Sequence, residues 1–212
     1  MLQKLENHIH QNLSFLKDKK LLLAVSGGID SMVLVDLFHK LKYDVAVAHC
    51  NFQLREQESD DDEEFVKSQI LELSSRAQSR ENKLNIPLFI QKFDTKKFAE
   101  QKKLSIQVVA RNLRYDWFYT LLVNQNFDFI ITAHHLDDSI ETFLINFTRG
   151  TGLEGLTGIP IQNDKIIRPL LAFSRDEIVA YAKQNDIKWR EDSSNSTDKY
   201  WRNKLRQIGR AH

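Results

Sequence analysis

The sequence lacks several features that mark particular classes of protein. Its 212 residues include one cysteine, Cys50, which excludes an internal disulfide and a cysteine-rich zinc or iron–sulfur site within the chain. No apolar run approaches the roughly 18 residues that a membrane-spanning helix needs. The N-terminal segment MLQKLENHIHQNL is polar and helix-like, unlike a secretion signal. These absences predict a cytoplasmic protein with no membrane partner.

The chain also lacks an excess of charge of either sign. Its 30 basic and 29 acidic residues leave a formal net charge of +1, so any contact with nucleic acid must come from local patches. The hydrophobic fraction of 42% is ample for the core of one large domain. Glycine is largely confined to 27–28 and 150–158, which marks two places where the backbone bends sharply or approaches a ligand.

Strand-like and helix-like segments alternate along the chain. Strands are expected at Leu21–Val25, Asp44–His49, Ile86–Gln91 and Phe127–Thr132, with short ones near Ile159–Ile161 and Lys165–Ile167. Helices are expected over 1–18, Ser31–Leu41, Glu58–Leu84, Thr95–Lys103, Ile106–Asn124, Asp137–Thr148 and Ser174–Asn185. This order predicts an α/β fold, with a parallel twisted sheet, right-handed crossovers and helices on both faces. We assign residues 1–206 to one domain and 207–212 to a tail.

The most informative segment is the turn between the first strand and the helix that follows it, Ser26-Gly27-Gly28-Ile29-Asp30-Ser31. A strand, a glycine turn and a helix N-terminus gather free backbone N–H groups around an anion, and the two hydroxyls add donors. The turn is too short for the Walker A spacing and lacks the third glycine of the dinucleotide fingerprint. It resembles the SGGxDS pyrophosphate loop of the PP-loop ATP pyrophosphatases, which implies ATP as co-substrate. An ordinary βα turn is the alternative.

A second chemical cluster, Thr132-Ala-His-His-Leu-Asp-Asp-Ser-Ile-Glu-Thr-Phe143, follows the fourth main strand, where ligands bind in open α/β sheets. Helical spacing places Glu141 on one face with Asp137 or Asp138. Clustered carboxylates beside a nucleotide suit either Mg²⁺ or a cationic substrate. Capping of the helix N-terminus explains one of the two aspartates, but not Glu141 together with His134 and His135.

Two arginine-bearing segments are further candidates. In ARNLRYDWF, Arg111 and Arg114 share one stripe of a helix and are spaced to clamp phosphates, and surface arginines paired with Asp116 are the alternative. The segment Trp201-Arg-Asn-Lys-Leu-Arg206 places three cations around an aromatic residue, as in many RNA-binding helices. A solvated basic helix is the alternative for this second segment.

Together, these segments resemble the N-terminal catalytic domain of the tRNA(Ile)-lysidine synthetases. The resemblance is carried, in the family's order, by AVSGGIDSMVL, AHCNFQLREQESDDDEEFV, ARNLRYDWF, TAHHLDDSIETFLINFTRGTGLEGLTGIP, IIRPLL, SRDEI and EDSSNSTDKYWRNKLR. SGGxDS alone indicates only a PP-loop protein, whereas the run Ala133–Pro160, EDSSN and RNKLR are specific to this family. Phe52 stands where many members carry histidine, so we assign it no catalytic role. Family members usually continue into tRNA-binding domains, which are expected to be absent from this chain.

The resemblance implies a ligase reaction. ATP would activate the C2 carbonyl oxygen of the wobble cytidine in an isoleucine tRNA with a CAU anticodon, as an adenylate, with release of pyrophosphate. The ε-amine of free L-lysine would then attack C2 and displace AMP, giving lysidine. Residues Ser26 to Ser31 would bind the phosphates of ATP, and Asp30 would hold Mg²⁺.

The resemblance also implies roles for the other candidates. Asp138 and Glu141 would receive the lysine ammonium and take its proton, because only the neutral amine is a nucleophile. Asp137 and His134 would complete the substrate site. The cations that would meet tRNA phosphate or the leaving group are Arg111, Arg114 and Arg206.

Two other functions fit parts of the pattern. A tRNA thiolase shares the PP-loop but generally uses several cysteines, and this chain has only Cys50. A domain that binds ATP without a working RNA site is the second alternative.

Overall fold

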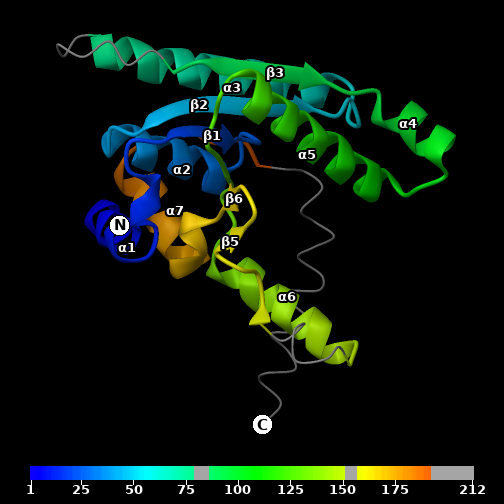
Figure 1. Ribbon diagram of the computed structural model, residues 1–212. Coiled ribbons are helices and arrows are strands. Elements are labelled where there is room, and N and C mark those ends of the chain that lie inside the picture. Colours follow the sequence, from blue (N-terminus) through cyan, green and yellow to red (C-terminus); the bar gives the residue numbers. More distant parts are fainter. Residues whose placement is uncertain (79–85, 151–156, 192–212) are drawn as a thin grey trace.

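The computed structural model describes residues 1–78, 86–150 and 157–191. In these ranges the chain forms a six-stranded sheet in the order β3-β2-β1-β4-β6-β5 (Figure 1). The short β5 pairs antiparallel with β6, and all other neighbouring strands are parallel. The predicted α/β class is confirmed. The strands are β1 (Lys20–Ala24), β2 (Asp44–Asn51), β3 (Leu88–Lys92), β4 (Phe129–Ile131), β5 (Gln162–Asn163) and β6 (Ile166–Ile167).

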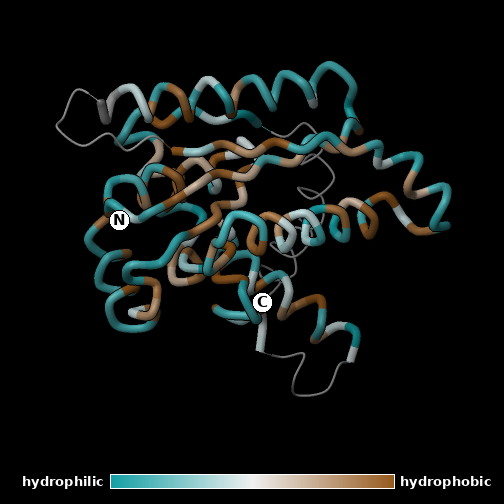
Figure 2. Tube along the Cα trace, turned by 45° about the horizontal axis from the view of Figure 1, so that its top comes forward, coloured by the Kyte–Doolittle hydropathy of each residue, from teal (hydrophilic) through white to brown (hydrophobic). Residues whose placement is uncertain are grey.

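Helices cover both faces of this sheet. Alternate residues of β1 explain the two layers, because Leu21 and Leu23 pack in one core cluster with α1, α2 and α7, whereas Leu22 packs in the other with α5. Figure 2 shows hydrophobic residues concentrated in the strands and hydrophilic ones along much of α3. The helices are α1 (Leu2–Asn12), η1 (Ser14–Leu16), α2 (Ile29–Lys40), α3 (Gln57–Gln78), α4 (Thr95–Lys102), α5 (Ile106–Asn124), α6 (Leu136–Thr148), η3 (Pro169–Ala172) and α7 (Arg175–Gln184).

The strand order reverses at β1, which pairs with β2 on one side and with β4 on the other. In open α/β sheets, such a reversal opens a crevice beyond the carboxyl ends of the two diverging strands. The segment 25–31 leaves β1 at this edge, and the segment 132–138 leaves β4 beside it. The topology therefore brings the two chemical clusters of the sequence to one place.

Some predicted helix boundaries are wrong. The first helix ends at Asn12, short of residue 18, because the backbone at Leu13 (φ −135°) leaves the helical region and a 3-10 turn follows. The helix after the glycine turn begins at Ile29, two residues before the predicted Ser31, because the extended Gly28 is its N-cap and already accepts a bond from Met32 N at 3.0 Å. The predicted end of the long charged helix, Leu84, lies outside the described residues.

The strand expected at Ile159–Ile161 is also wrong, since β5 lies at Gln162–Asn163. Gly158 adopts a left-handed backbone (φ +70°) and Pro160 has no N–H to donate to a ladder. The Ile161 carbonyl oxygen instead accepts a bond from Arg168 N at 2.9 Å. The sheet edge is thus a short antiparallel hairpin, within a sheet that the sequence predicted to be parallel.

A buried histidine links β2 to the end of β1. His49 is 3% exposed, and its Nδ1 lies 2.9 Å from the Val25 carbonyl oxygen. Burial lowers the pKa of His49 below its ordinary value of 6.5, although the bond to Val25 and nearby carboxylates act in the opposite direction. The folded protein therefore keeps His49 neutral at a pH where the unfolded chain already binds a proton.

We expect this histidine to make the fold sensitive to mild acid. Because the folded-state pKa is depressed, stability is full above about pH 6.5 and is lost as pH falls toward the folded-state pKa, by about 1.4 kcal/mol per unit of depression. His49→Asn keeps a donor for Val25 and removes the titration. Thermal unfolding between pH 7 and pH 5 is expected to show a smaller loss of Tm for this variant than for the wild type. Parallel pH profiles would contradict the assignment.

Candidate functional site

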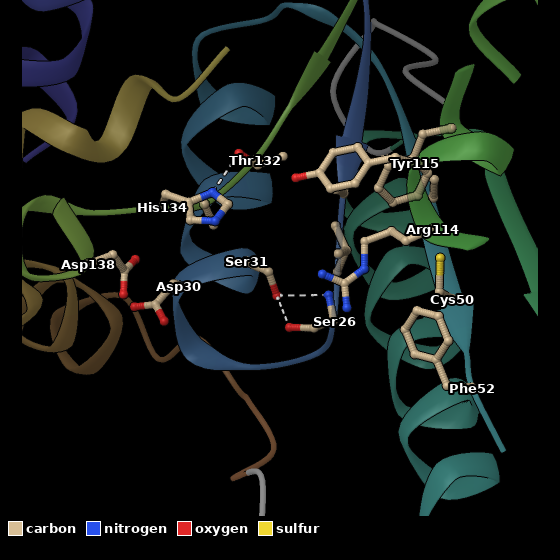
Figure 3. Close-up of a pocket in the computed structure, with 15 residues that line it drawn as sticks. Ser26, Asp30, Ser31, Cys50, Phe52, Arg114, Tyr115, Thr132, His134 and Asp138 are labelled. Atoms are coloured by element: carbon tan, nitrogen blue, oxygen red, sulfur yellow. Dashed lines mark hydrogen bonds between the residues drawn. The ribbon is translucent and has the colours of Figure 1, made fainter. Parts of the chain in front are cut away.

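A cavity of about 240 Å³ opens at the carboxyl ends of β1, β2 and β4 (Figure 3). Its walls come from the loop after β1, from β2, from α5 and from the segment after β4. The structure thus gathers side chains from distant parts of the sequence around one space. The predicted site residues that line it are Ser26, Asp30, Ser31, Arg114, His134 and Asp138.

The backbone N–H groups of the glycine turn converge on one oxygen atom. Ser26 N and Gly27 N donate to Ser31 Oγ at 3.3 and 3.2 Å, and that hydroxyl donates to the Gly28 carbonyl oxygen at 2.8 Å. Bonds of 3.2 to 3.3 Å are at the long end for N–H donors, so they are weak. A phosphate oxygen would replace them with shorter, charge-assisted bonds. The turn therefore has the geometry of an anion cradle.

Gly27 is the position in this turn that requires glycine. Its φ is +93°, and a Cβ there would lie 3.3 Å from Val66 Cγ2 on α3. Gly28 has a φ of −73°, which any residue adopts, and a Cβ there would meet only Ser26 Oγ at 3.4 Å. The Gly27 carbonyl also accepts a bond from Arg190 N at 3.0 Å. The turn is thus held by contacts that fix its left-handed residue.

Asp30 lies in the first turn of α2, where the helix dipole favours a negative charge. Its Oδ2 pairs with Arg175 Nη1 at the start of α7. Its Oδ1 is buried without a hydrogen-bond partner, 3.9 Å from His135 Nε2. A buried carboxylate oxygen with a free lone pair beside a phosphate cradle fits a Mg²⁺ ligand. No group of three potential protein ligands gathers in the described ranges, so phosphate and water would complete the metal's shell.

The two aspartates of the second cluster have different surroundings. Asp138 lines the cavity, and its Oδ2 accepts a bond from His135 N at 3.0 Å, which caps α6. Asp137 is half exposed, and its Oδ2 accepts a bond from Arg175 N at 2.8 Å, which caps α7. Both aspartates are therefore helix caps, although the sequence assigned capping to only one of them. Of the two, only Asp138 lines the cavity.

The remaining members of this cluster are also placed by the structure. His134 lines the cavity, and its Nδ1 lies 2.9 Å from Thr132 Oγ1. His135 is buried beneath Asp138 and Asp30. Glu141 lies one turn beyond Asp138 on α6, half-buried and outside the cavity lining. Of the predicted carboxylate pair, Asp138 and Glu141, only Asp138 lines the cavity.

The arginines of α5 stack on aromatic rings. Arg114 Cζ lies 5.2 Å from the centre of the Phe52 ring, and Arg111 Cζ lies 4.9 Å from that of Tyr115. Neither forms an ion pair with Asp116 in the described part of the chain, so that alternative is not supported. Arg114 reaches the cavity, as Figure 3 shows. Arg206 lies outside the described residues.

Several residues that line the cavity were not predicted from the sequence. Cys50, Phe52, Tyr115 and Thr132 line the cavity but were not assigned to the site. Tyr115 and Thr132 adjoin assigned residues, so position in the motif was an available signal for them. Phe52 departs from the family pattern, yet its ring forms the surface on which Arg114 lies. No local signal predicts Arg175, because it meets Asp30 only through the fold.

The chain is similar to known proteins over nearly its whole length. The family described as PP-loop domain matches residues 1–210. The tRNA(Ile)-lysidine synthase of Bacteroides thetaiotaomicron is 43% identical over 204 residues, which cover 96% of this chain and 45% of that protein. That of Chlorobaculum tepidum is 41% identical over 208 residues, covering 96% of this chain and 60% of that protein. The chain spans about half the length of these curated relatives.

Solved structures agree on the fold. A U34-tRNA thiolase from Methanococcus maripaludis superimposes with a TM-score of 0.66 at 16% identity, covering 90% of this chain and 66% of that one. An NH3-dependent NAD synthetase from Campylobacter jejuni gives a TM-score of 0.57 at 18% identity, covering all of this chain and 86% of that one. No helix in the described residues is long and apolar enough to cross a membrane. With the SGGxDS turn at the carboxyl edge of this sheet and a family match over nearly its whole length, the chain belongs to the PP-loop domain family.

Proposed function

We propose that this chain carries the catalytic site for ATP-dependent ligation of free L-lysine to C2 of the wobble cytidine of isoleucine tRNA, giving lysidine. The observation that carries the proposal is the meeting of the phosphate cradle, Arg114, His134 and Asp138 in one cavity. Similarity to tRNA(Ile)-lysidine synthases at 35% to 43% identity supports it. The chain spans about half the length of those relatives. The activity and the partners of the whole protein are therefore also part of what we propose. The reaction would take place in the cytoplasm.

ATP would bind with its phosphates at the glycine turn. The N–H groups of Ser26 and Gly27, now turned toward Ser31, would donate to phosphate oxygens. Asp30 would hold Mg²⁺ through its unpartnered Oδ1, and the metal would neutralise phosphate charge. Arg114 would face the negative charge that develops on the leaving group or on a tRNA phosphate. Arg111 and Arg206 are proposed to contact the tRNA or the leaving group as well.

Lysine would approach from the side of α6. The side chain of Asp138 lies in the cavity, where it would bind the ammonium group and accept the proton that the amine must lose before it attacks C2. His134, with its pKa lowered chiefly by burial, stays neutral near pH 7 and adds a hydrogen-bonding wall. Asp137 and Glu141 do not line the cavity, so they would contribute to the substrate site through their negative charge from outside it.

The identity and amounts of the products that are formed from ATP test this proposal. We expect AMP and pyrophosphate to appear in equal amounts, and only when isoleucine tRNA with a CAU anticodon is present. Formation of lysidine should in addition require lysine. Release of ADP and phosphate, or turnover that ignores the anticodon, would contradict the proposed reaction.

A tRNA thiolase is the second candidate, favoured by the fold shared with the Methanococcus maripaludis enzyme. Burial raises the pKa of the Cys50 thiol to about 12, despite the opposing charge of Arg114. At pH 7 the thiol is therefore protonated and a poor nucleophile. We expect Cys50→Ala to retain ATP-dependent activity within about threefold, because the substitution removes only cavity-wall volume. Complete loss of activity, measured with tRNA in steady state, would favour the thiolase.

Affinity for tRNA is expected to depend steeply on salt. The formal net charge of +1 leaves only local arginine groups to neutralise phosphates, and each phosphate contact adds to the salt dependence. We predict binding by these 212 residues that is measurable at low salt and lost at about 0.15 M. Filter binding over a salt series would measure this. Tight binding that salt does not weaken would show a more complete RNA site than the described arginines provide.

A further inference from the structure

Arg168, the residue after β6, has no role in the steps proposed above. It is 5% exposed, and its Nη1 donates to the Pro160 carbonyl oxygen at 2.7 Å. Its Nε is buried without a hydrogen-bond partner. No carboxylate in the described ranges acts on it, and burial lowers its pKa. A buried guanidinium without a counter-ion is unfavourable, because it has lost hydration and gained no opposite charge.

Arg111 extends this positive region across the ring of Tyr115. Arg111 lies on the face of that ring, and both Tyr115 and Arg111 lie close enough to the Arg168 guanidinium to act on it electrostatically. Tyr115 itself lines the cavity, and Figure 3 shows its hydroxyl directed into it. Two cations with no described carboxylate partner therefore flank one cavity-lining residue. An arrangement of this kind is typical of a binding site for an oxyanion.

We propose that Arg168, Arg111 and Tyr115 form a second anion subsite at the margin of the cavity, which Tyr115 lines, separate from the glycine turn, and that it takes one carboxylate or phosphate group. The identity of that group rests on the proposed function, under which it is the α-carboxylate of lysine or a phosphate of the tRNA. The arrangement of charges favours the carboxylate. Figure 3 shows His134 between Asp138 on one side and Arg114 on the other, so the cavity has an acidic and a basic side, as an amino-acid zwitterion requires.

The affinities of the protein for three amines distinguish the two sources of the anion, the α-carboxylate of lysine and a phosphate of the tRNA. Lysine and ε-aminocaproate carry a carboxylate, whereas cadaverine does not. Calorimetry is expected to show that the wild type binds the two carboxylates about 10- to 100-fold more tightly than cadaverine, which is the range for charge-assisted hydrogen bonds. Arg168→Met should lose most of this preference. Arg149→Met, the same change at an exposed arginine at the end of α6, should keep it.

Inorganic phosphate tests the subsite without any lysine-dependent activity. Gly27→Val disables the glycine turn, so phosphate that still raises the Tm of this variant binds elsewhere. We expect that rise to disappear in Gly27→Val/Arg168→Met. If the rise depends on Arg168 but lysine does not bind, the subsite stands and the lysine-based function fails. If Arg168→Met changes the phosphate response but not the amine preference, the group is a phosphate.

The Tm of Arg168 variants distinguishes an anion-binding role of Arg168 from a structural one. Removal of a buried, unpaired charge is expected to leave Tm in anion-free buffer unchanged or higher. Arg168→Lys keeps the charge without the guanidinium fork and should keep part of the phosphate response. The proposal is overturned if Arg168→Met lowers Tm, Arg168→Lys restores it, and both variants show wild-type responses to phosphate and to the amines.

Discussion

Gly27→Val is expected to abolish ATP binding while the sheet remains folded. Valine cannot adopt the φ of +93° without strain of about 1–3 kcal/mol, and its Cβ would press on Val66 Cγ2 at 3.3 Å. The turn must then rebuild, and the N–H groups of Ser26 and Gly27 no longer point to one place. Loss of two charge-assisted bonds corresponds to roughly a 100-fold or greater loss of affinity. Calorimetric titration with ATP measures it.

Gly28→Ala is the control for backbone strain in this experiment. Gly28 has an ordinary φ of −73°, and the added methyl group would meet only Ser26 Oγ at 3.4 Å. Its Tm should stay close to that of the wild type, whereas Gly27→Val should unfold several degrees lower. Wild-type ATP affinity in Gly27→Val would remove the glycine turn from the nucleotide site.

Asp138→Asn is expected to lower kcat for lysidine formation by about 10²- to 10⁴-fold, which is the usual contribution of a general base. The lysine amine is protonated at neutral pH, and the carboxylate of Asp138, which lines the cavity, is the group that we propose accepts its proton. Asparagine keeps an oxygen that accepts the bond from His135 N, so the cap of α6 and the Tm should survive. Steady-state rates with lysine and ATP varied separately measure the effect.

Variants of two neighbouring carboxylates serve as comparisons for Asp138→Asn. Asp137→Asn changes a half-exposed cap of α7 outside the cavity, so we expect a much smaller loss of kcat. Glu141→Gln should raise the lysine requirement more than the ATP requirement if Glu141 supports the ammonium. Equal losses for both substrates in Asp138→Asn would indicate a role with the metal rather than with lysine.

The sequence predicts this site well where the chemistry is local. The glycine turn is contiguous, and its strand and helix are signalled by apolar patterning, so its position at the sheet edge follows from topology. His134 and Asp138 are found for the same reason, because they directly follow β4. The left-handed conformation belongs to Gly27 and not to Gly28, a distinction that two adjacent glycines do not reveal.

Contacts between distant segments were not predictable in this way. Asp30 meets Arg175 across 145 positions, and nothing near either residue indicates the other. In the sequence, the acidic run 58–64 indicates only the start of a long charged helix. In the structure, Asp62 pairs with Arg55 at 2.8 Å and with Arg190 at 2.5 Å, close to the carbonyl of Gly27. Part of the charge run thus supports the turn, and only the tertiary fold shows it.

The most direct test of the central claim is mass analysis of nucleosides from isoleucine tRNA after incubation with the chain, ATP and lysine. We predict that one cytidine, at the wobble position, gains the mass of a lysine joined with loss of water, and only when both small molecules are present. The gain should disappear with Gly27→Val and with Asp138→Asn. An unmodified wobble cytidine, or a gain that corresponds to sulfur, would contradict the proposed function.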